Sequence, residues 1–148
     1  MPTQTLQQAL HIVGIALHTH NGEAFDTIPQ HWQRFGSEQV LSRIPNKLSD
    51  DVYAVYTRFE NSPLRPDSRY TLIIGAAVTS TDAMPEGMSS VTIPPSLRKT
   101  YPVEPATPQQ VGATWLQLWQ EPGLQSTAVA DFERFTPDGR IEISIGVA

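Results

Sequence analysis

The stretch TPQQVGATWLQLWQEPGLQSTAVADFERFTPDGRIEISIGV, residues 107–147, contains the signals that decide the fold. It opens with the clearest helix start in the chain, because Thr107 can cap a helix, Pro108 suits its first position, and Gln110 stands where a capping box has Gln or Glu. Apolar residues then recur at three and four residue steps and form the inward face of the helix: Val111, Trp115 and Leu118. Residues 122–123, Pro-Gly, predict the end of the helix.

Two strands are predicted after this helix. Residues 127–135 form the first, residues 137–139 form a Pro-Asp-Gly turn with glycine where a positive φ is needed, and residues 140–147 form the second. The first strand carries Glu133 between Phe132 and Phe135. One carboxylate among aromatic rings suits the binding of an apolar cation.

The first half of the chain predicts the same order of elements. Residues 6–17 indicate a strand that ends at a turn over residues 18–22. A helix is predicted from Thr27, with Pro29 in its first turn, an inward face at helical spacing, and Gly36 at its end. That inward face consists of Ile28, Trp32 and Phe35.

A short helical turn is predicted over residues 38–44, followed by a strand over residues 51–60 and a buried strand over residues 70–78 that contains Gly75. The proline-rich connection over residues 79–95 resembles a linker, but residues 91–93 and 97–103 can each pair as short strands. We therefore interpret it as an ordered crossover.

The two halves also share residues. Phe59-Glu60 with Gly75 parallels Phe132-Glu133 with Gly146, and Trp32 parallels Trp115. We therefore predict one domain over residues 1–148 that contains two pseudo-repeats, approximately 5–80 and 88–148. The predicted fold class is α+β: a duplicated strand-helix-strand-strand module that forms a curved antiparallel sheet, with two helices on one face and a central ligand groove.

Composition narrows the function classes. A net charge of −5, from 10 basic and 15 acidic residues, gives no basic patch for direct nucleic-acid contact. The chain has no cysteine, so disulfides, thiol catalysis and thiolate metal sites are excluded. The amino terminus lacks the pattern of a secretory signal, and the longest apolar run is too short for a membrane span. We expect a cytoplasmic protein without membrane association.

Glu133 is the first candidate for a ligand contact. If its side chain faces the groove, a buried carboxylate must hold a proton, accept hydrogen bonds, or wait for a cation. The alternative is a solvated strand residue beside Arg134, since glutamate is almost never fully buried.

Aromatic residues are the other candidates. Trp115 and Trp119 stand four apart on one helix, where such pairs are more often core than ligand walls; Trp115 has the stronger core signal, and Trp119 lies nearer the helix end. Four tyrosines could supply rings and hydroxyls to the groove, although parity does not tell which strand face looks inward: Tyr53, Tyr56, Tyr70 and Tyr101.

No motif indicates a catalytic centre or a cofactor. His18, His20 and His31 lack a carboxylate or cysteine partner at a metal-binding interval, so exposed turn histidines are favoured over a metal site. A G-x-S-x-G elbow, a P-loop and a G-x-G-x-x-G fingerprint do not occur. We predict no catalytic residue, no cofactor and no metal.

The order and spacing of several motifs resemble the GyrI-like effector-binding superfamily. The motifs are Ile28, Trp32 and Phe35 on the first helix, the run with Gly75, Ile93-Pro94 before the second half, and Phe132-Glu133-Arg134-Phe135 before an Ile-rich strand. The superfamily supplies the ligand-sensing domains of AraC-type and MerR-type multidrug regulators and has stand-alone relatives. The resemblance covers nearly the whole chain.

The resemblance implies a role for Glu133, because the matching glutamate of the family neutralises lipophilic cations at the base of a hydrophobic cleft. The family usually has tyrosine where this chain has Phe135, so the resemblance assigns no hydroxyl to that position. It implies a sensor without a DNA-binding segment of its own. The predicted ligand-binding residues are Glu133, Trp119, Trp115, Tyr56, Tyr70 and Phe135.

Three functions remain open at this point. The first is a stand-alone binding protein for amphipathic, cationic drugs or dyes, without chemistry of its own. The second is a hydrolase of reactive small electrophiles with Glu133 as general base, because some relatives of the superfamily open strained electrophiles. The third is a protein-interaction module like the gyrase-inhibiting relatives, which includes association with a separate DNA-binding regulator subunit. A monomer or a homodimer is expected.

Overall fold

A computed structural model describes residues 3–20, 22–58, 69–124, 126–127 and 129–148, without the side chains of Ala24, Phe25 and Trp119. The described elements of the first half are β1 (Thr3–Leu6), β2 (Leu10–His20), α1 (Ala24–Ser37), α2 (Val40–Arg43), β3 (Val52–Thr57) and β4 (Arg69–Val78). Those of the second half are β5 (Ser89–Ile93), β6 (Ser96–Pro102), α3 (Pro108–Trp119), β7 (Ala130–Phe135) and β8 (Ile141–Val147). The chain is therefore an α+β protein, as predicted.

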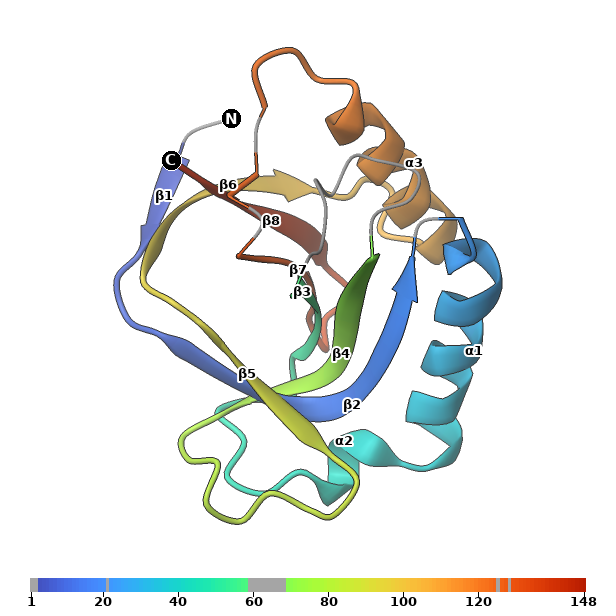
Figure 1. Ribbon diagram of the computed structural model, residues 1–148, viewed down its shortest axis with the longest axis vertical. Helices are drawn as coiled ribbons and strands as arrows, with labels where there is room; N and C mark the ends of the chain where they lie inside the picture. The colour runs from blue at the N-terminus through green and yellow to red at the C-terminus, as the bar shows by residue number, and fades with distance from the viewer. Residues whose placement is uncertain (1–2, 21, 59–68, 125, 128) are drawn as a thin grey trace.

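The strands form one strongly curved antiparallel sheet of 8 strands, in the order β1-β6-β8-β7-β3-β4-β2-β5. The two halves of the chain meet at the β7–β3 pair. On either side of this pair the strands correspond in order: β8 to β4, β6 to β2, and β1 to β5. Figure 1 shows the sheet curling around an interior, with α1 and α3 on its outer, right-hand side. The duplication and the curved antiparallel sheet are confirmed.

The strand register aligns the two halves residue by residue. Gly14 lies opposite Gly75 between β2 and β4, and Arg98 lies opposite Gly146 between β6 and β8. Gly75 of the first half therefore corresponds to Gly146 of the second. Tyr56 on β3 pairs with the residue three positions before Gly75, and Glu133 on β7 pairs with the residue three positions before Gly146, so Tyr56 and Glu133 occupy equivalent positions in the two halves. The residues first matched with Phe132-Glu133, Phe59 and Glu60, lie outside the described residues.

Gly14 and Gly75 allow β2 and β4 to approach each other closely. A Cβ atom on Gly14 would lie 2.0 Å from the carbonyl oxygen of Ile74, and one on Gly75 would lie 1.9 Å from that of Val13. Any side chain there would push β2 and β4 apart, which is a common reason for glycine inside a strand.

Both faces of the sheet are buried. The interior face holds a core that includes Tyr53, Val55, Ile73 and Phe132. The outer face of β3 and β4 packs Ala54, Leu72 and Ile74 against α1, and α3 covers Ile143 and Ile145 of β8. Alternate residues of one strand therefore enter different cores, which places Tyr56 and Glu133 on the face that carries the helices.

The helix signals are confirmed in part. The Thr107 hydroxyl accepts a hydrogen bond from the Gln110 backbone N–H at 3.3 Å, which is the predicted cap of α3. Helix α1 begins three residues before Thr27, so Pro29 lies inside the helix rather than in its first turn. The helix ends at Ser37, one residue beyond Gly36.

Two predictions about the amino-terminal strand were wrong. The predicted strand over residues 6–17 is two strands, β1 and β2, since the chain leaves β6 after Leu6 and pairs with β4 and β5 from Leu10. His18 and His20 lie within β2 rather than in a turn, because their backbone pairs with Thr71 and Arg69 of β4. Among the described residues, no helix is long and apolar enough to span a bilayer.

Candidate functional site

Glu133 is buried on the helix-bearing face of β7, with 2% of its surface exposed. Its Oε2 accepts a hydrogen bond from the Tyr56 hydroxyl at 2.6 Å and another from the Trp115 indole N–H at 2.7 Å. Tyr56 comes from β3 and Trp115 from α3, so three elements meet at one carboxylate oxygen. The solvated alternative for Glu133 is therefore wrong.

The environment of Glu133 disfavours its charge. Burial raises the pKa of Glu133, and the hydrogen bonds from Tyr56 and Trp115 oppose that shift only in part. Among the described residues, no lysine, arginine or histidine forms an ion pair with this carboxylate. Within the described part of the chain, Glu133 is therefore a buried acid without a positive partner.

Aromatic rings surround the carboxylate. The Tyr56 ring makes edge contacts with Tyr70 at 5.6 Å and with Trp115 at 5.4 Å between centroids. Burial and the nearby Glu133 carboxylate raise the pKa of Tyr70 to about 12. The same two causes raise the pKa of Tyr56 well above its ordinary value. Both hydroxyls therefore stay protonated at neutral pH.

A second ring group lies beside the first on the same sheet face. Phe135, two positions after Glu133 on β7, packs edge-on against Trp32 of α1 at 5.1 Å, and Trp32 packs against Phe35 at 5.9 Å. Trp32, Tyr56, Trp115 and Phe135 are each only half-buried. The rings around Glu133 therefore extend from the buried acid to the protein surface.

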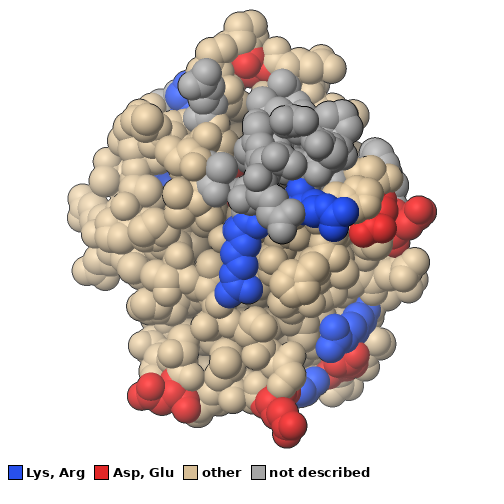
Figure 2. Space-filling view, in the orientation of Figure 1, with Lys and Arg blue, Asp and Glu red and all other residues tan. Residues whose placement is uncertain are grey.

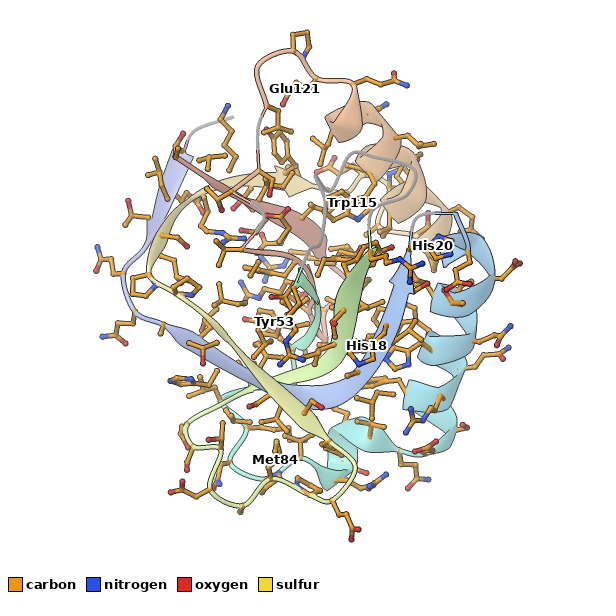
Figure 3. All side chains as sticks on the ribbon, viewed as in Figure 1. His18, His20, Tyr53, Met84, Trp115 and Glu121 are labelled. Carbon is orange, nitrogen blue, oxygen red and sulfur yellow. The ribbon has the colours of Figure 1, made fainter. Side chains whose placement is uncertain are left out.

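Four of the predicted ligand residues meet at one place: Glu133, Tyr56, Tyr70 and Trp115. Phe135 lies next to them on β7 and contacts Trp32 instead. Trp115 packs in the α3 core, as its core signal indicated, but its indole also reaches Glu133. Figure 3 shows it between α3 and the sheet. The predicted contact of Trp119 lies outside the described side chains, although its backbone closes α3.

The other two candidate tyrosines lie elsewhere. Tyr53 faces the interior of the sheet and packs against Phe132 at 5.6 Å, and Figure 3 shows it inside the curve. Tyr101 of β6 donates a hydrogen bond at 3.0 Å to Glu121, which follows the end of α3. Sequence reasoning missed the contact of Trp32 with Phe135, because the helical spacing of Trp32 with Ile28 and Phe35 indicated only core packing.

Asp131 and Asp51 are also buried acids, but each has partners within the protein. The Gly146 backbone N–H and the Ser126 hydroxyl donate to Asp131 at 2.9 and 2.7 Å. The Arg134 guanidinium lies 2.7 Å from Asp51. Of these three acids, only Glu133 has hydrogen-bond donors without a nearby cation or a backbone N–H.

Glu133 does not line either of two surface hollows formed by the described residues. One has a volume of about 240 Å³ at the end of β2 and β4 and shares Tyr70 with the ring cluster around Glu133. The other, about 550 Å³, lies between β6 and α3 and is lined by Tyr101, Thr114 and Glu121, among others. The predicted central groove therefore stays a prediction.

The histidines have structural partners. The His31 Nε2 lies 2.9 Å from the Ile15 carbonyl oxygen, and burial lowers the pKa of His31. The His18 ring bonds the Thr71 hydroxyl at 2.9 Å. Within the described part of the chain, no group of three metal-ligating side chains could hold an ion.

Charges of both signs lie on the face of the molecule shown in Figure 2. Figure 2 shows basic side chains near the middle of one face and acidic ones mainly along its lower and right-hand margins. Because positive and negative side chains share this face, its charge does not indicate a ligand site, and the candidate site is identified by the buried Glu133 and the rings around it.

A family model described as "Cass2: Integron-associated effector binding protein" matches residues 8–147. No curated protein matches the sequence. The chain is similar in structure to an integron cassette protein from the mobile metagenome of Vibrio cholerae, with 19% identity over 99% of this chain and 95% of that chain and a TM-score of 0.79.

Two further solved structures have the same fold. One is a protein assigned to bacterial transcription regulation from Staphylococcus aureus MU50, with 20% identity, coverage of 99% and 96%, and a TM-score of 0.74. The other is SAV2435 bound to tetraphenylphosphonium, with 20% identity, coverage of 99% and 93%, and a TM-score of 0.71. At such identities, likeness in structure establishes the fold and leaves the ligand of this chain to be argued from its own residues.

Proposed function

The chain belongs to the family of integron-associated effector binding proteins, and we propose that its effector is a lipophilic organic cation whose charge is neutralised by Glu133. The observation that carries the proposal is the Glu133 carboxylate itself, which is 2% exposed and has no cationic partner among the described residues. A bound cation would provide the positive charge that the described residues do not place beside this carboxylate.

The rings supply the other part of the affinity. Trp32, Tyr56, Trp115 and Phe135 form a largely apolar surface on which an aromatic or aliphatic ligand body can pack. Burial of apolar area contributes about 25 cal/mol per Å². A cation that lies over a ring gains about 0.5–2 kcal/mol more, with the upper end where water is excluded.

The likeness to known proteins supports this proposal in a general way. SAV2435, which shares the fold, is described as bound to tetraphenylphosphonium, a lipophilic cation. The resemblance of Phe132-Glu133-Arg134-Phe135 to the GyrI-like effector-binding motif supports a stand-alone sensor. A part in transcription, through a separate DNA-binding subunit, would follow from ligand binding and belongs to the same proposal.

The test is a fluorescence titration of the wild type and Glu133→Gln with a panel of lipophilic cations and neutral molecules of similar shape. Since Trp115 contacts Glu133, its emission should report occupancy directly. We expect Glu133→Gln to weaken the binding of cations about tenfold or more, because a charge-assisted interaction of roughly 1.5–3 kcal/mol is lost. Neutral molecules should lose little affinity.

Glu142→Gln is the matched control, because Glu142 is a half-buried glutamate on β8 that pairs with Arg134 on the interior face. It should leave cation affinity unchanged. Equal losses for cationic and neutral molecules in Glu133→Gln would contradict charge neutralisation by Glu133.

Hydrolysis of a reactive electrophile is the second candidate, with Glu133 as the base. The geometry favours binding over this reaction because Oε2 of Glu133 already accepts hydrogen bonds from Tyr56 and Trp115, and burial, which raises the pKa of Glu133, disfavours the ionised form that a general base requires. Turnover of strained electrophiles by the wild type, lost in Glu133→Gln, would reverse that preference.

A further inference from the structure

The two oxygens of Glu133 have different surroundings. Both hydrogen bonds, from the Tyr56 hydroxyl and the Trp115 indole N–H, go to Oε2. Oε1 accepts no hydrogen bond from the described residues. Oε2 is therefore held within the protein by two donors, whereas Oε1 has no donor among the described residues.

A buried carboxylate oxygen without a donor costs free energy, because it has lost its hydrogen bonds with water and gained none in the protein. A positive charge nearby lowers that cost through attraction alone. An N–H group aimed at Oε1 lowers it further, because it adds a short, charge-assisted hydrogen bond in the position that water would otherwise fill.

We propose that the protein selects lipophilic cations that carry an N–H donor, such as protonated tertiary amines, over quaternary cations of the same shape. This inference rests on the proposed function, since it assigns the chemical class of the ligand at the same carboxylate. A quaternary ammonium has a similar charge and apolar body, but it cannot donate to Oε1. The rings would hold both ligands, and Oε1 would distinguish them.

The arrangement of donors makes the selection specific to glutamate. In Glu133→Gln, the Tyr56 and Trp115 donors require an acceptor at the place of Oε2, so the amide oxygen should occupy it. The amide NH₂ then stands where Oε1 was and presents donors to the ligand. An N–H cation would meet a donor there, whereas a quaternary cation would have no hydrogen bond to lose.

The experiment compares three ligands with one naphthylmethyl body: the protonated dimethylamine, its quaternary trimethylammonium derivative, and the neutral carbon isostere with a tert-butyl group. Affinities are measured by calorimetry at one salt concentration and at a pH well below the pKa of the amine. In the wild type we expect the dimethylammonium ligand to bind about tenfold or more tightly than the quaternary ligand.

In Glu133→Gln the ratio of the two cations should fall to about one or below, and in Glu142→Gln it should equal the wild-type ratio. If the quaternary ligand binds as tightly as the protonated amine while both exceed the neutral isostere, the N–H preference is wrong and cation binding stands. If the preference persists unchanged in Glu133→Gln, it comes from ligand size, and this inference is again overturned. If all three ligands bind equally, or none binds, the proposed function itself fails.

Discussion

Asp131 and Glu133 lie on the same face of β7 and are buried to the same extent, each with 2% exposure, but their carboxylates have different kinds of partner. Asp131 accepts a bond from the Gly146 backbone N–H, together with the Ser126 hydroxyl, and the Arg98 charge acts on it. Glu133 accepts bonds from two side chains, Tyr56 and Trp115.

The donors to the two carboxylates differ in whether they can leave the carboxylate for water or a ligand. A backbone N–H in a strand cannot turn away from its acceptor without disrupting the sheet, so the bonds of Asp131 belong to the fold. A hydroxyl and an indole on half-buried side chains can turn toward water or a ligand. Burial alone therefore does not identify a binding carboxylate, and the nature of its donors does.

The largest expected effect is on stability. Asp131→Ala should lower the free energy of unfolding by about 3 kcal/mol, because it orphans the Gly146 N–H and removes the carboxylate that offsets the buried Arg98 charge. Glu133→Ala should cost about half as much, since Tyr56 and Trp115 can find other partners. Urea denaturation at neutral pH measures both. A larger cost for Glu133→Ala would reverse the assignment of structural and binding acid.

The next effect is on the pH dependence of cation binding. Because burial raises the pKa of Glu133, a cation must displace a proton at any pH below that raised value. Affinity should then fall as pH falls, by up to about tenfold per pH unit. Titrations over a pH series check this, and Glu133→Gln should give a flat profile. A flat profile in the wild type would mean that the acid is already ionised or is not involved.

A smaller effect comes from the donors. Tyr56→Phe removes one of the two bonds that favour the ionised form of Glu133, so it should cost about 1 kcal/mol of stability and move the onset of cation binding to higher pH. Tyr101→Phe is the matched control, because the Tyr101 hydroxyl bonds Glu121, beyond the end of α3, and not Glu133. An unchanged onset in Tyr56→Phe would show that this hydroxyl does not influence the acid.

The smallest effect is a gain in stability. Between the ordinary glutamate pKa and the raised one, the folded protein keeps a proton on Glu133 that the unfolded chain releases, so stability falls as pH rises through this interval. Glu133→Gln has no carboxyl group to titrate and therefore avoids this loss of stability. It should raise Tm at neutral pH by a few degrees, equivalent to about 1 kcal/mol or less in the free energy of unfolding. Thermal melts over a pH series measure it, and a lower Tm at every pH would contradict it.

Local signals in the sequence predicted the elements of the fold well where each signal was self-contained. The Thr107 cap and Pro108 set the start of α3 within one residue. The break between β1 and β2 was missed, because it depends on which neighbour each segment pairs with. Pairing across the sheet is not encoded in local spacing.

Much of the candidate site could also be predicted from the sequence, but its geometry could not. The motif Phe132-Glu133-Arg134-Phe135 indicated Glu133 as a ligand contact, and the other candidates were chosen because they are aromatic. Tyr56 was one of four candidate tyrosines, but the sequence did not indicate that its hydroxyl bonds Glu133, because that contact crosses between two strands and the two halves of the chain. The partners of Asp131 were hidden for the same reason.

The most direct measurement of the central claim is the carbon-13 chemical shift of the Glu133 side-chain carboxyl group, followed through a pH titration without ligand and with a saturating lipophilic cation. Its signal is assigned by its absence in Glu133→Gln. The ligand-free protein should titrate above the ordinary glutamate range, and the cation should move that titration to lower pH because it replaces the proton. A titration in the ordinary range without ligand, or one that the cation leaves unchanged, would contradict the account.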